Sequence, residues 1–320
     1  MTNADFQPIS GFDLPRYAGI PTFMRLPHLL PGDVLYKDVE IGLIGVPWDG
    51  GTSNRPGARH GPRQLRDLST MIRAEHPTSR IRPFEAANCA DLGDVSPNPS
   101  DLMESLNRTT AFYERIRDDG IIPLTAGGDH LVSYPILKAL AAKRPLGMIH
   151  FDAHTDLYDG YFGGTPYNHG TPFRRAIEDG YIDASRVVQI GLRGTRYNLD
   201  DIEFGRKHGV TMIMIEELMD RGPADVMMQA RHIVGSKETY VTFDIDFIDP
   251  AFAPGTGTPE IGGPDTLTAQ RLVRELATVN LVGADLVEVS PPFDQSGNTA
   301  WVGISIMFEL LCVIVQSLRK

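Results

Sequence analysis

The stretch GMIHFDAHTD, residues 147–156, joins a mostly apolar run to an abrupt cluster of polar side chains. Gly147–Phe151 is predicted to form a short strand, and its one polar member, His150, is expected to face the core. Strands of this composition are covered on both faces, as in parallel sheets packed between helices. The cluster of acidic and imidazole side chains, DAHTD, begins at Asp152, where the strand is predicted to end.

Similar short apolar or β-branched runs alternate with longer helix-like stretches along the rest of the chain. This alternation predicts an α/β fold with a parallel sheet and helices on both of its faces. Periodicity alone does not separate an open sheet from a closed barrel. The predicted strands are 40–46, 121–125, 147–151, 187–191, 210–213, 240–243 and 281–289, and the predicted helices are 61–74, 101–118, 134–143, 172–179, 199–208, 224–233, 268–278 and 299–317.

Polar side chains also follow three other predicted strands. The segment GGDH occupies residues 127–130, the segment DID occupies residues 244–246, and Glu288 lies near the end of a fourth strand. Ligands of parallel α/β sheets bind outside the carboxyl ends of the strands. Charged groups emerging from a buried sheet are costly unless they are paired or bound to a metal. The sequence therefore predicts that four segments converge on one site.

The converging segments supply candidate metal ligands with oxygen and nitrogen donors only. Positions 152, 154 and 156 share one face if that segment stays extended. A structural zinc takes four ligands, usually with sulfur, whereas a larger oxygen-rich set suits two divalent ions with bridging carboxylates. The lack of thiolate favours manganese, while the histidines leave nickel, cobalt or iron open. The candidates are His130, Asp152, His154, Asp156, Asp244 and Asp246.

Composition excludes several classes of partner. Thirty Lys and Arg against 41 Asp and Glu give a net charge of −11, which disfavours nucleic acid. The cysteines, Cys89 and Cys312, lie in apolar settings and are expected to be reduced thiols of a cytoplasmic protein. Residues 1–30 lack a secretory pattern. The apolar stretch 301–318 contains Glu309, so a buried helix is expected and no membrane partner.

At these residues the sequence resembles the ureohydrolase superfamily, which includes arginase and agmatinase and the guanidino-acid hydrolases. The matching segments are GGDH (127–130), DAHTD (152–156), DIDFIDPAFAPGTGTPE (244–260), EVSPP (288–292) and GVPWDGGTSNRPGARHGP (45–62). The resemblance implies a three-layer α/β/α sandwich with an eight-stranded parallel sheet. It also implies one catalytic domain over residues 36–320, after an N-terminal extension of residues 1–35. Relatives of this kind commonly form trimers or hexamers.

The resemblance also implies roles for individual residues. One manganese ion would be held by His130, Asp152, Asp156 and Asp244, and the second by His154, Asp152, Asp244 and Asp246. Glu288 is the candidate partner of the guanidinium, because a carboxylate accepts two parallel hydrogen bonds from that planar group. His169 matches the family's proton shuttle, and a histidine titrates near neutral pH. Asp156 has a second candidate duty, which is to orient the hydroxide.

The loop between Asp156 and His169 is expected to select the tail of the substrate. Tyr161 is the chosen specificity residue, since a large aromatic side chain shortens a pocket and its hydroxyl can donate to a carboxylate. The predicted activity is hydrolysis of 3-guanidinopropionate to β-alanine and urea. The alternatives are hydrolysis of 4-guanidinobutyrate or agmatine, and, from another class, a non-catalytic metal-binding assembly subunit. The metal motifs contain no Lys or Arg to clamp phosphate, which argues against a two-metal phosphoesterase.

Overall fold

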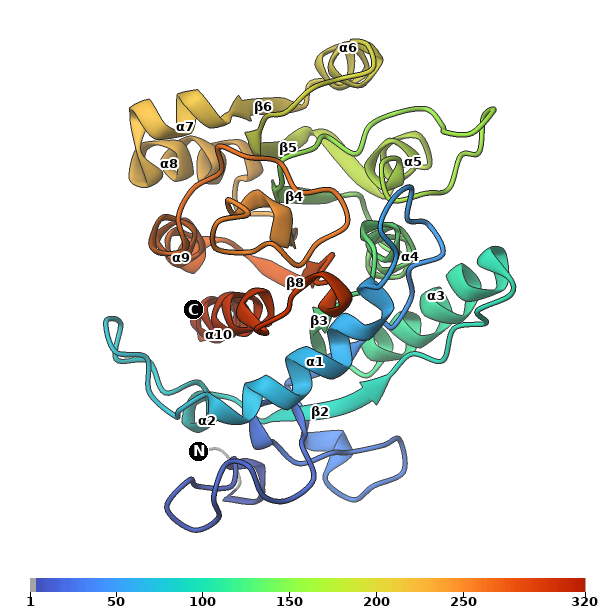
Figure 1. The fold of residues 1–320 in the computed structure, drawn as a ribbon. Coiled ribbons are helices and arrows are strands. Elements are labelled where there is room, and N and C mark those ends of the chain that lie inside the picture. Colours follow the sequence, from blue (N-terminus) through green and yellow to red (C-terminus); the bar gives the residue numbers. More distant parts are fainter. Residues whose placement is uncertain (1–3, 320) are drawn as a thin grey trace.

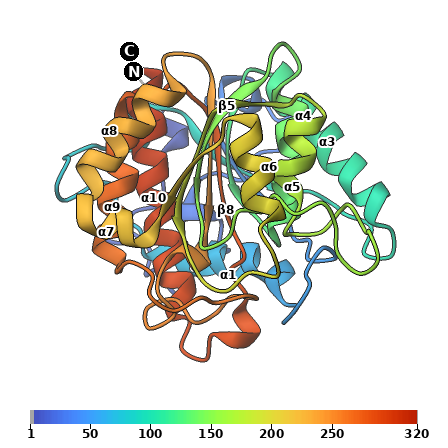
Figure 2. The ribbon, with the colours of Figure 1, turned by 90° about the horizontal axis from the view of Figure 1, so that it is seen from above.

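The computed structural model describes residues 4–319 as an eight-stranded sheet between two layers of helices (Figures 1 and 2). Every strand pair is parallel, and the strand order is β2-β1-β3-β8-β7-β4-β5-β6. The predicted three-layer α/β/α sandwich with an eight-stranded parallel sheet is confirmed, and the sheet is open. The strands are β1 (Ile41–Gly45), β2 (Cys89–Asp94), β3 (Ile122–Ala126), β4 (Leu146–Phe151), β5 (Ile182–Leu192), β6 (Thr211–Met214), β7 (Thr239–Asp244) and β8 (Leu281–Val287).

The helices divide into two layers, which the view from above separates clearly (Figure 2). Helices α3, α4, α5 and α6 cover one face of the sheet, and α1, α7, α8, α9 and α10 cover the other. Each layer closes over its own cluster of buried apolar side chains. The helices are α1 (Gly61–Leu68), α2 (Pro83–Ala86), α3 (Leu102–Asp118), α4 (Ser133–Leu140), α5 (Pro172–Glu178), α6 (Asp200–His208), α7 (Ile215–Arg221), α8 (Pro223–Val234), α9 (Thr266–Arg274) and α10 (Asn298–Leu318).

Strand β2 and the short helices α2 and α7 are the strand and helices that the sequence patterns miss. Strand β2 carries Asp91 in its middle, which breaks the apolar run. The structure buries that carboxylate by pairing it with Arg66, whose Nε lies 2.8 Å from Asp91 Oδ2. Helix α7 is short and begins directly after β6, so no break in the pattern separates it from the strand.

Helix α10 is long and apolar enough to cross a membrane by length and composition. In the structure, 67% of the most apolar 18-residue stretch of this helix is buried. The helix packs against α1, α9 and β8. Its one acidic side chain, Glu309, is buried with His76 Nε2 3.0 Å away and Arg274 Nε at the same distance. The helix therefore takes the place predicted for it, in the core of the molecule.

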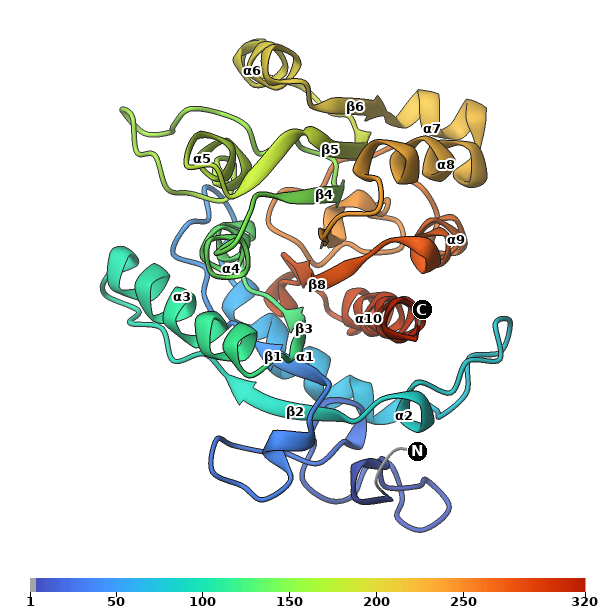
Figure 3. The same ribbon diagram turned by 180° about the vertical axis from the view of Figure 1, so that it is seen from behind.

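The segment before β1 packs beside the edge strand β2, as the views from front and back agree (Figures 1 and 3). Phe23, Met24 and Leu26 are buried in the same cluster as β1. The Phe23 amide donates to Asp91 Oδ2 at 2.8 Å, and residue 28 forms an isolated bridge to residue 91. This segment thus covers an edge that would otherwise present unpaired backbone groups. The proposed boundary at residue 35 stays a prediction.

The order of the strands explains where the functional side chains meet. The polar segments that follow β3, β8, β7 and β4 all belong to the four central, mutually adjacent strands. Neighbouring strands lie about 4.8 Å apart, so residues at their carboxyl ends are within reach of one another. The loop after β3 is held closely, because Asp129 N donates to Trp48 O and Glu288 N donates to Gly128 O, both at 2.8 Å.

Replacing Gly128 with alanine should destabilise the protein. A Cβ at this position would lie 1.6 Å from the carbonyl oxygen of Trp48, which is a backbone atom and cannot swing away. Overpacking of this kind costs about 1–3 kcal/mol or more. We expect thermal unfolding of Gly128→Ala to begin several degrees below that of the unmodified chain.

Gly257→Ala is the matched control, because its Cβ would meet nothing closer than 3.5 Å. Its melting temperature should match that of the unmodified chain. Equal melting temperatures for Gly128→Ala and Gly257→Ala would contradict the close backbone approach at residue 128.

Candidate metal centre and active site

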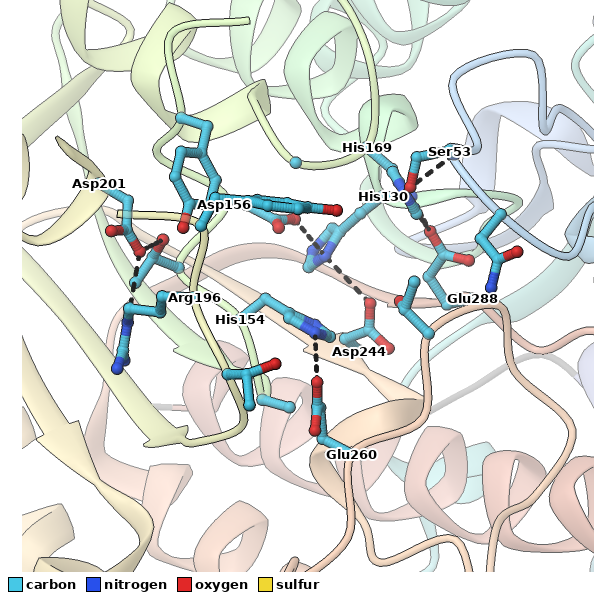
Figure 4. A pocket seen from close by; sticks show the side chains of 18 of the residues that line it. Ser53, His130, His154, Asp156, His169, Arg196, Asp201, Asp244, Glu260 and Glu288 are labelled. Carbon is cyan, nitrogen blue, oxygen red and sulfur yellow. Dashed lines mark hydrogen bonds and ion pairs between the residues drawn. The ribbon is translucent and has the colours of Figure 1, made fainter. Parts of the chain in front are cut away.

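The carboxyl ends of the central strands open into a cavity of about 380 Å³ (Figure 4). Its walls combine acidic side chains and imidazoles from the predicted segments with aromatic side chains from the loop after β4. The residues that line it include Ser53, His130, His154, Asp156, Tyr158, Tyr161, His169, Arg193, Arg196, Tyr197, Asp201, Asp244, Glu260 and Glu288.

A repeated local turn places the carboxylates. Three times an aspartate at a strand end accepts a hydrogen bond from the backbone amide two residues further on. The donor and acceptor lie 2.6 Å apart for His154 N and Asp152 Oδ1, and 2.8 Å apart for Asp246 N and Asp244 Oδ1. In the same way Asp129 Oδ1 accepts from Leu131 N at 3.1 Å. Such turns end the strand and hold the carboxylate beside it.

His130 points one ring nitrogen at three carboxylates. Its Nδ1 lies 3.0 Å from Asp152 Oδ2, 3.0 Å from Asp156 Oδ2 and 3.3 Å from Asp244 Oδ2. Despite these distances, Nδ1 is buried and has no hydrogen-bond partner among the described residues. A nitrogen and three oxygens that converge without hydrogen bonding are arranged as ligands around one point.

The other ring nitrogen of His130 shows which tautomer faces these carboxylates. Thr242 Oγ1 donates its single proton to Asp285 Oδ1 at 2.5 Å, so it can only accept from His130 Nε2, 2.8 Å away. The proton of the neutral imidazole is therefore on Nε2, and the lone pair of Nδ1 faces the carboxylates. A lone pair directed at anions calls for a cation between them.

A second group of ligands surrounds His154. Its Nδ1 lies 3.1 Å from Asp246 Oδ2 and 3.4 Å from Asp152 Oδ1. Asp152 therefore presents one oxygen to each histidine, which is the arrangement of a bridging carboxylate. On the far side of the ring, His154 Nε2 lies 3.9 Å from Glu260 Oε1, and this imidazole lowers the pKa of Glu260 (Figure 4).

The electrostatics of the cluster favour cations as well. Burial, together with the charges of Asp246 and Asp152, raises the pKa of Asp244 well above its ordinary value. Burial likewise raises the pKa of Asp246 to about 6, against the lowering effect of His154. A cation held between these carboxylates would favour their ionised forms. The donor set and its charge thus fit two divalent cations.

His150 faces the core, as predicted, but it also has a polar role that the sequence did not reveal. Its ring is buried, but Nε2 donates to Asp152 Oδ2 at 2.7 Å, because Nδ1 accepts from Gln189 Nε2 at 2.9 Å. His150 therefore orients the bridging carboxylate. Position 150 precedes Asp152 by two residues, so strand alternation brings both side chains to the same face. An imidazole inside an apolar run was the signal that could have revealed this role.

His150 belongs to a polar row that crosses the sheet beneath the cavity. The row consists of cross-strand partners on β3, β8, β7, β4 and β5, and each of its side chains is fully buried. Buried polar groups of this kind need hydrogen-bond partners. Four of these groups bond to one another or to a candidate metal ligand, and Thr125 bonds to Tyr113. The polar row comprises Thr125, Asp285, Thr242, His150 and Gln189.

Glu288 and His169 lie side by side in the lining of the cavity (Figure 4). Glu288 Oε1 accepts from His169 Nδ1 at 2.8 Å and from the His130 amide at 3.0 Å. Its Oε2 is buried and has no partner in the described part of the chain. Glu288 and Asp156 both have left-handed backbones, with φ of 64° and 54°. Such strain in non-glycine residues is typical of functional sites.

Comparison with known proteins identifies the family. Residues 39–312 match the arginase family. The chain belongs to the arginase family. It is 55% identical over 320 residues to guanidinopropionase of Pseudomonas aeruginosa, covering 100% of this chain and 99% of that protein. It is 44% identical over 315 residues to guanidinobutyrase of the same organism, covering 98% of each.

Solved structures of the arginase family agree with this result. Proclavaminate amidinohydrolase from Streptomyces clavuligerus superposes with a TM-score of 0.89 at 38% identity, covering 95% of this chain and 99% of that one. A hypothetical agmatinase from Burkholderia thailandensis gives a TM-score of 0.86 at 36% identity, covering 95% of this chain and 94% of that one. The predicted resemblance to the ureohydrolase superfamily is therefore confirmed.

The structure brings together every site residue predicted from the arginase-family motifs. The six candidate ligands form the two groups around His130 and His154, and Glu288, His169 and Tyr161 line the same cavity. Their roles stay predictions. One detail differs, because the left-handed backbone of Asp156 ends the extended run assumed for residues 152–156. The side chain of Asp156 nevertheless reaches His130.

Several residues of this arginase-family site were not found from the sequence. Ser53 contacts His169, Glu260 contacts His154, and Gln189 and Thr242 hold the two buried histidines. Ser53 and Glu260 lie inside quoted family segments but carry no pattern of their own. Gln189 and Thr242 are polar members of predicted strands, which is a signal that can be searched for.

Removing the Thr242 hydroxyl should weaken metal binding. In Thr242→Val the Nε2–H of His130 loses its acceptor, so a proton on Nδ1 competes with the metal. Partners that orient metal ligands are typically worth 10- to 100-fold in affinity. We expect a loss of that size in Mn²⁺ affinity, measured by competition with a chelator.

Thr125→Val is the control, because Thr125 lies in the same polar row but its hydroxyl bonds to Tyr113, at 2.6 Å, and not to a metal-facing histidine. It should lose stability without losing metal affinity. Equal metal affinities for the two variants would show that Thr242 does not set the tautomer of His130.

Proposed function

We propose that this chain is a hydrolase that cuts a guanidino compound and releases urea, with two divalent cations in the cavity. The observation that carries the proposal is Glu288 Oε2, an acceptor without a partner among the described residues, in the same cavity as the ligand cluster. A buried carboxylate oxygen of this kind needs a donor, and a guanidinium offers several in one plane. Guanidinium binding would thus satisfy Glu288 and hold the guanidino carbon in the cavity.

The proposed cations are manganese, and nickel or another divalent ion is the alternative. Carboxylates outnumber imidazoles among the candidate ligands, which favours a hard ion, and the described cysteines lie outside the cavity. Ions at these residues would supply a nucleophile by lowering the pKa of water from 15.7 to about 7. The residues that would hold them are His130, Asp152, His154, Asp156, Asp244 and Asp246.

The side chains of the cavity bind, orient and move protons in this proposal. Glu288 binds the guanidinium through Oε2 while the His130 amide and His169 hold Oε1 in place. Asp156, which lines the same cavity, orients the attacking water. Burial lowers the pKa of His169, but Glu288 and nearby carboxylates raise it to about 9. His169 therefore holds a proton at neutral pH, ready for the departing amine.

The proposed substrate is 3-guanidinopropionate, with β-alanine and urea as products. Its support is the higher identity to guanidinopropionase than to guanidinobutyrase, 55% against 44%. Tyr161 also lines the cavity and packs against Tyr158 and Tyr197, with ring centroids 5.7 Å and 6.1 Å away. Three aromatic rings shorten this end of the cavity, which favours a short tail. The alternatives are 4-guanidinobutyrate and agmatine.

An acidic tail finds a cation in Arg196, which lines the cavity beside Asp201 (Figure 4). Its Nε is 3.7 Å from Asp201 Oδ2, so this contact is loose. The other lining arginine, Arg193, is engaged by backbone carbonyls of residues 191, 246 and 260. Arg196 therefore favours a guanidino acid over agmatine, whose tail is cationic.

Self-association into a trimer or hexamer is part of the proposal. It is supported by large apolar side chains on the surface of the N-terminal segment, where Phe12, Tyr17 and Ile20 are each at least 90% exposed. Burying such side chains between subunits would be favourable. Light scattering of the full chain measures the assembly.

The first experiment loads the purified chain with Mn²⁺ and compares urea release from 3-guanidinopropionate, 4-guanidinobutyrate, agmatine and arginine. Preference for 3-guanidinopropionate would support the whole proposal. Preference for another of the four would keep the class of reaction and overturn the tail assignment. Two bound metals with no urea from any substrate would favour the non-catalytic alternative.

Tyr161→Met should shift the preference toward the longer acid. Loss of the ring lengthens the pocket, and one methylene in a pocket is worth about 1–3 kcal/mol, or roughly 10- to 200-fold. We expect the ratio of kcat/KM for 4-guanidinobutyrate over 3-guanidinopropionate to rise by at least tenfold. Tyr167→Met is the control, since Tyr167 lies in the same loop but its ring packs at a tilt against Tyr134. An unchanged ratio in Tyr161→Met would remove Tyr161 from the specificity determinants.

A further inference from the structure

Both ring nitrogens of His169 are engaged by the protein. Nδ1 donates to Glu288 Oε1 at 2.8 Å. Nε2 lies 2.6 Å from the hydroxyl oxygen of Ser53 (Figure 4). In the neutral ring Nε2 accepts from the Ser53 backbone amide, 3.1 Å away, and in the imidazolium it is a donor that the Ser53 hydroxyl oxygen can accept from. His169 therefore has no ring nitrogen left to reach a substrate directly, although it is the residue proposed to move the proton.

A proton on His169 has two ways out of the ring. The route through Nδ1 leads to Glu288, but protonating Glu288 would remove the charge that binds the guanidinium. The route through Nε2 leads to the Ser53 hydroxyl, which lines the same cavity. A hydroxyl can accept one proton while donating another, so the second route leaves the binding carboxylate ionised.

The loop that carries Ser53 is held independently of that hydroxyl. Gly51 N donates to Asp129 Oδ2 at 2.6 Å, and His169 N donates to Gly51 O at 3.0 Å. The Ser53 amide adds its own bond to the ring. These contacts use backbone atoms of residues 51 and 53, which remain when the side chain of Ser53 is shortened. The hydroxyl is thus free for chemistry and is not required to place the loop.

We propose that the Ser53 hydroxyl delivers the proton to the departing amine, as the last member of a His169–Ser53 relay. The inference rests on the proposed function. When the C–N bond breaks, the amine nitrogen takes the proton of Ser53 Oγ, and Oγ takes the proton from Nε2 of the His169 imidazolium. His169 becomes neutral and is recharged by a proton of the next attacking water. In each turnover the amine nitrogen gains two protons, one through Ser53 and one from the hydroxyl that the attacking water leaves on the guanidino carbon, so an ammonium product and neutral urea leave.

The first test compares Ser53→Ala with Ser53→Thr, which keeps a hydroxyl. We expect kcat of Ser53→Ala for 3-guanidinopropionate to fall about 100-fold, within the range of general acid catalysis. KM and metal content should stay within twofold, and Ser53→Thr should retain most of the activity. An unchanged kcat in Ser53→Ala would overturn the relay.

A second substrate separates proton delivery from structural damage. The 2,2-difluoro analogue of 3-guanidinopropionate releases a much less basic amine, which needs less help from an acid. Ser53→Ala should lose tenfold or less on this analogue. Equal losses on the two substrates would overturn the relay in favour of a structural role. No urea from the unmodified chain with any guanidino acid would instead overturn the proposed function.

A third readout does not depend on activity. Ring ¹⁵N NMR of the metal-free chain at pH 10, above the His169 pKa of about 9, reports the tautomer. His169→Gln identifies the signal. We expect Nδ1 to carry the proton and Nε2 to carry none. A ring protonated at Nε2 would contradict the contact with the Ser53 amide, and with it the relay.

Discussion

The site depends on one electrostatic constraint, which is that four buried aspartates converge at the centre of the sheet. Burial and mutual repulsion hold the pKa of Asp244 well above its ordinary value, so the carboxylates need compensating cations to stay ionised. The side chains around the carboxylates are positioned to bind cations. The Asx turns hold the carboxylates in place, and the histidines turn lone pairs toward the same points. A protein interior tolerates such a cluster when its charge is offset by protonation, by pairing or by metal ions, and these converging side chains could hold metal ions.

The hydrogen bonds behind the ligands reach through the sheet itself. Asp285 accepts from Thr242, which accepts from His130, and Gln189 donates to His150, which donates to Asp152. Each chain of bonds fixes the tautomer of one histidine. His130 must donate from Nε2 because Thr242 can only accept, and His150 must donate from Nε2 because its Nδ1 accepts from Gln189. Since the members of the polar row are cross-strand partners, the register of the sheet and the protonation of the site are set together.

The amino-acid sequence predicts the class of fold and the members of the site well, for physical reasons. Continuous apolar runs mark buried parallel strands, and aspartates directly after them can only lie at the carboxyl ends. It predicts less well what depends on tertiary pairing. Strand β2 was missed because Asp91 is acceptable in a strand only once Arg66 neutralises it. The polar role of His150 was missed because its partner, Gln189, lies 39 residues away in the chain. Ser53 gave no signal, since its contact with His169 joins two loops.

The position of β8 in the sheet bears on how the chain is made. This last strand lies between β3 and β7, so the segments that carry His130 and Asp244 become neighbours across it only after residues 281–287 have been synthesised. Until then the nascent chain holds two open strand edges and an incomplete set of ligands. Non-local parallel pairing is slow, and open edges invite wrong partners. The order of translation would therefore delay assembly of the candidate metal site until almost the whole chain is available to enclose it.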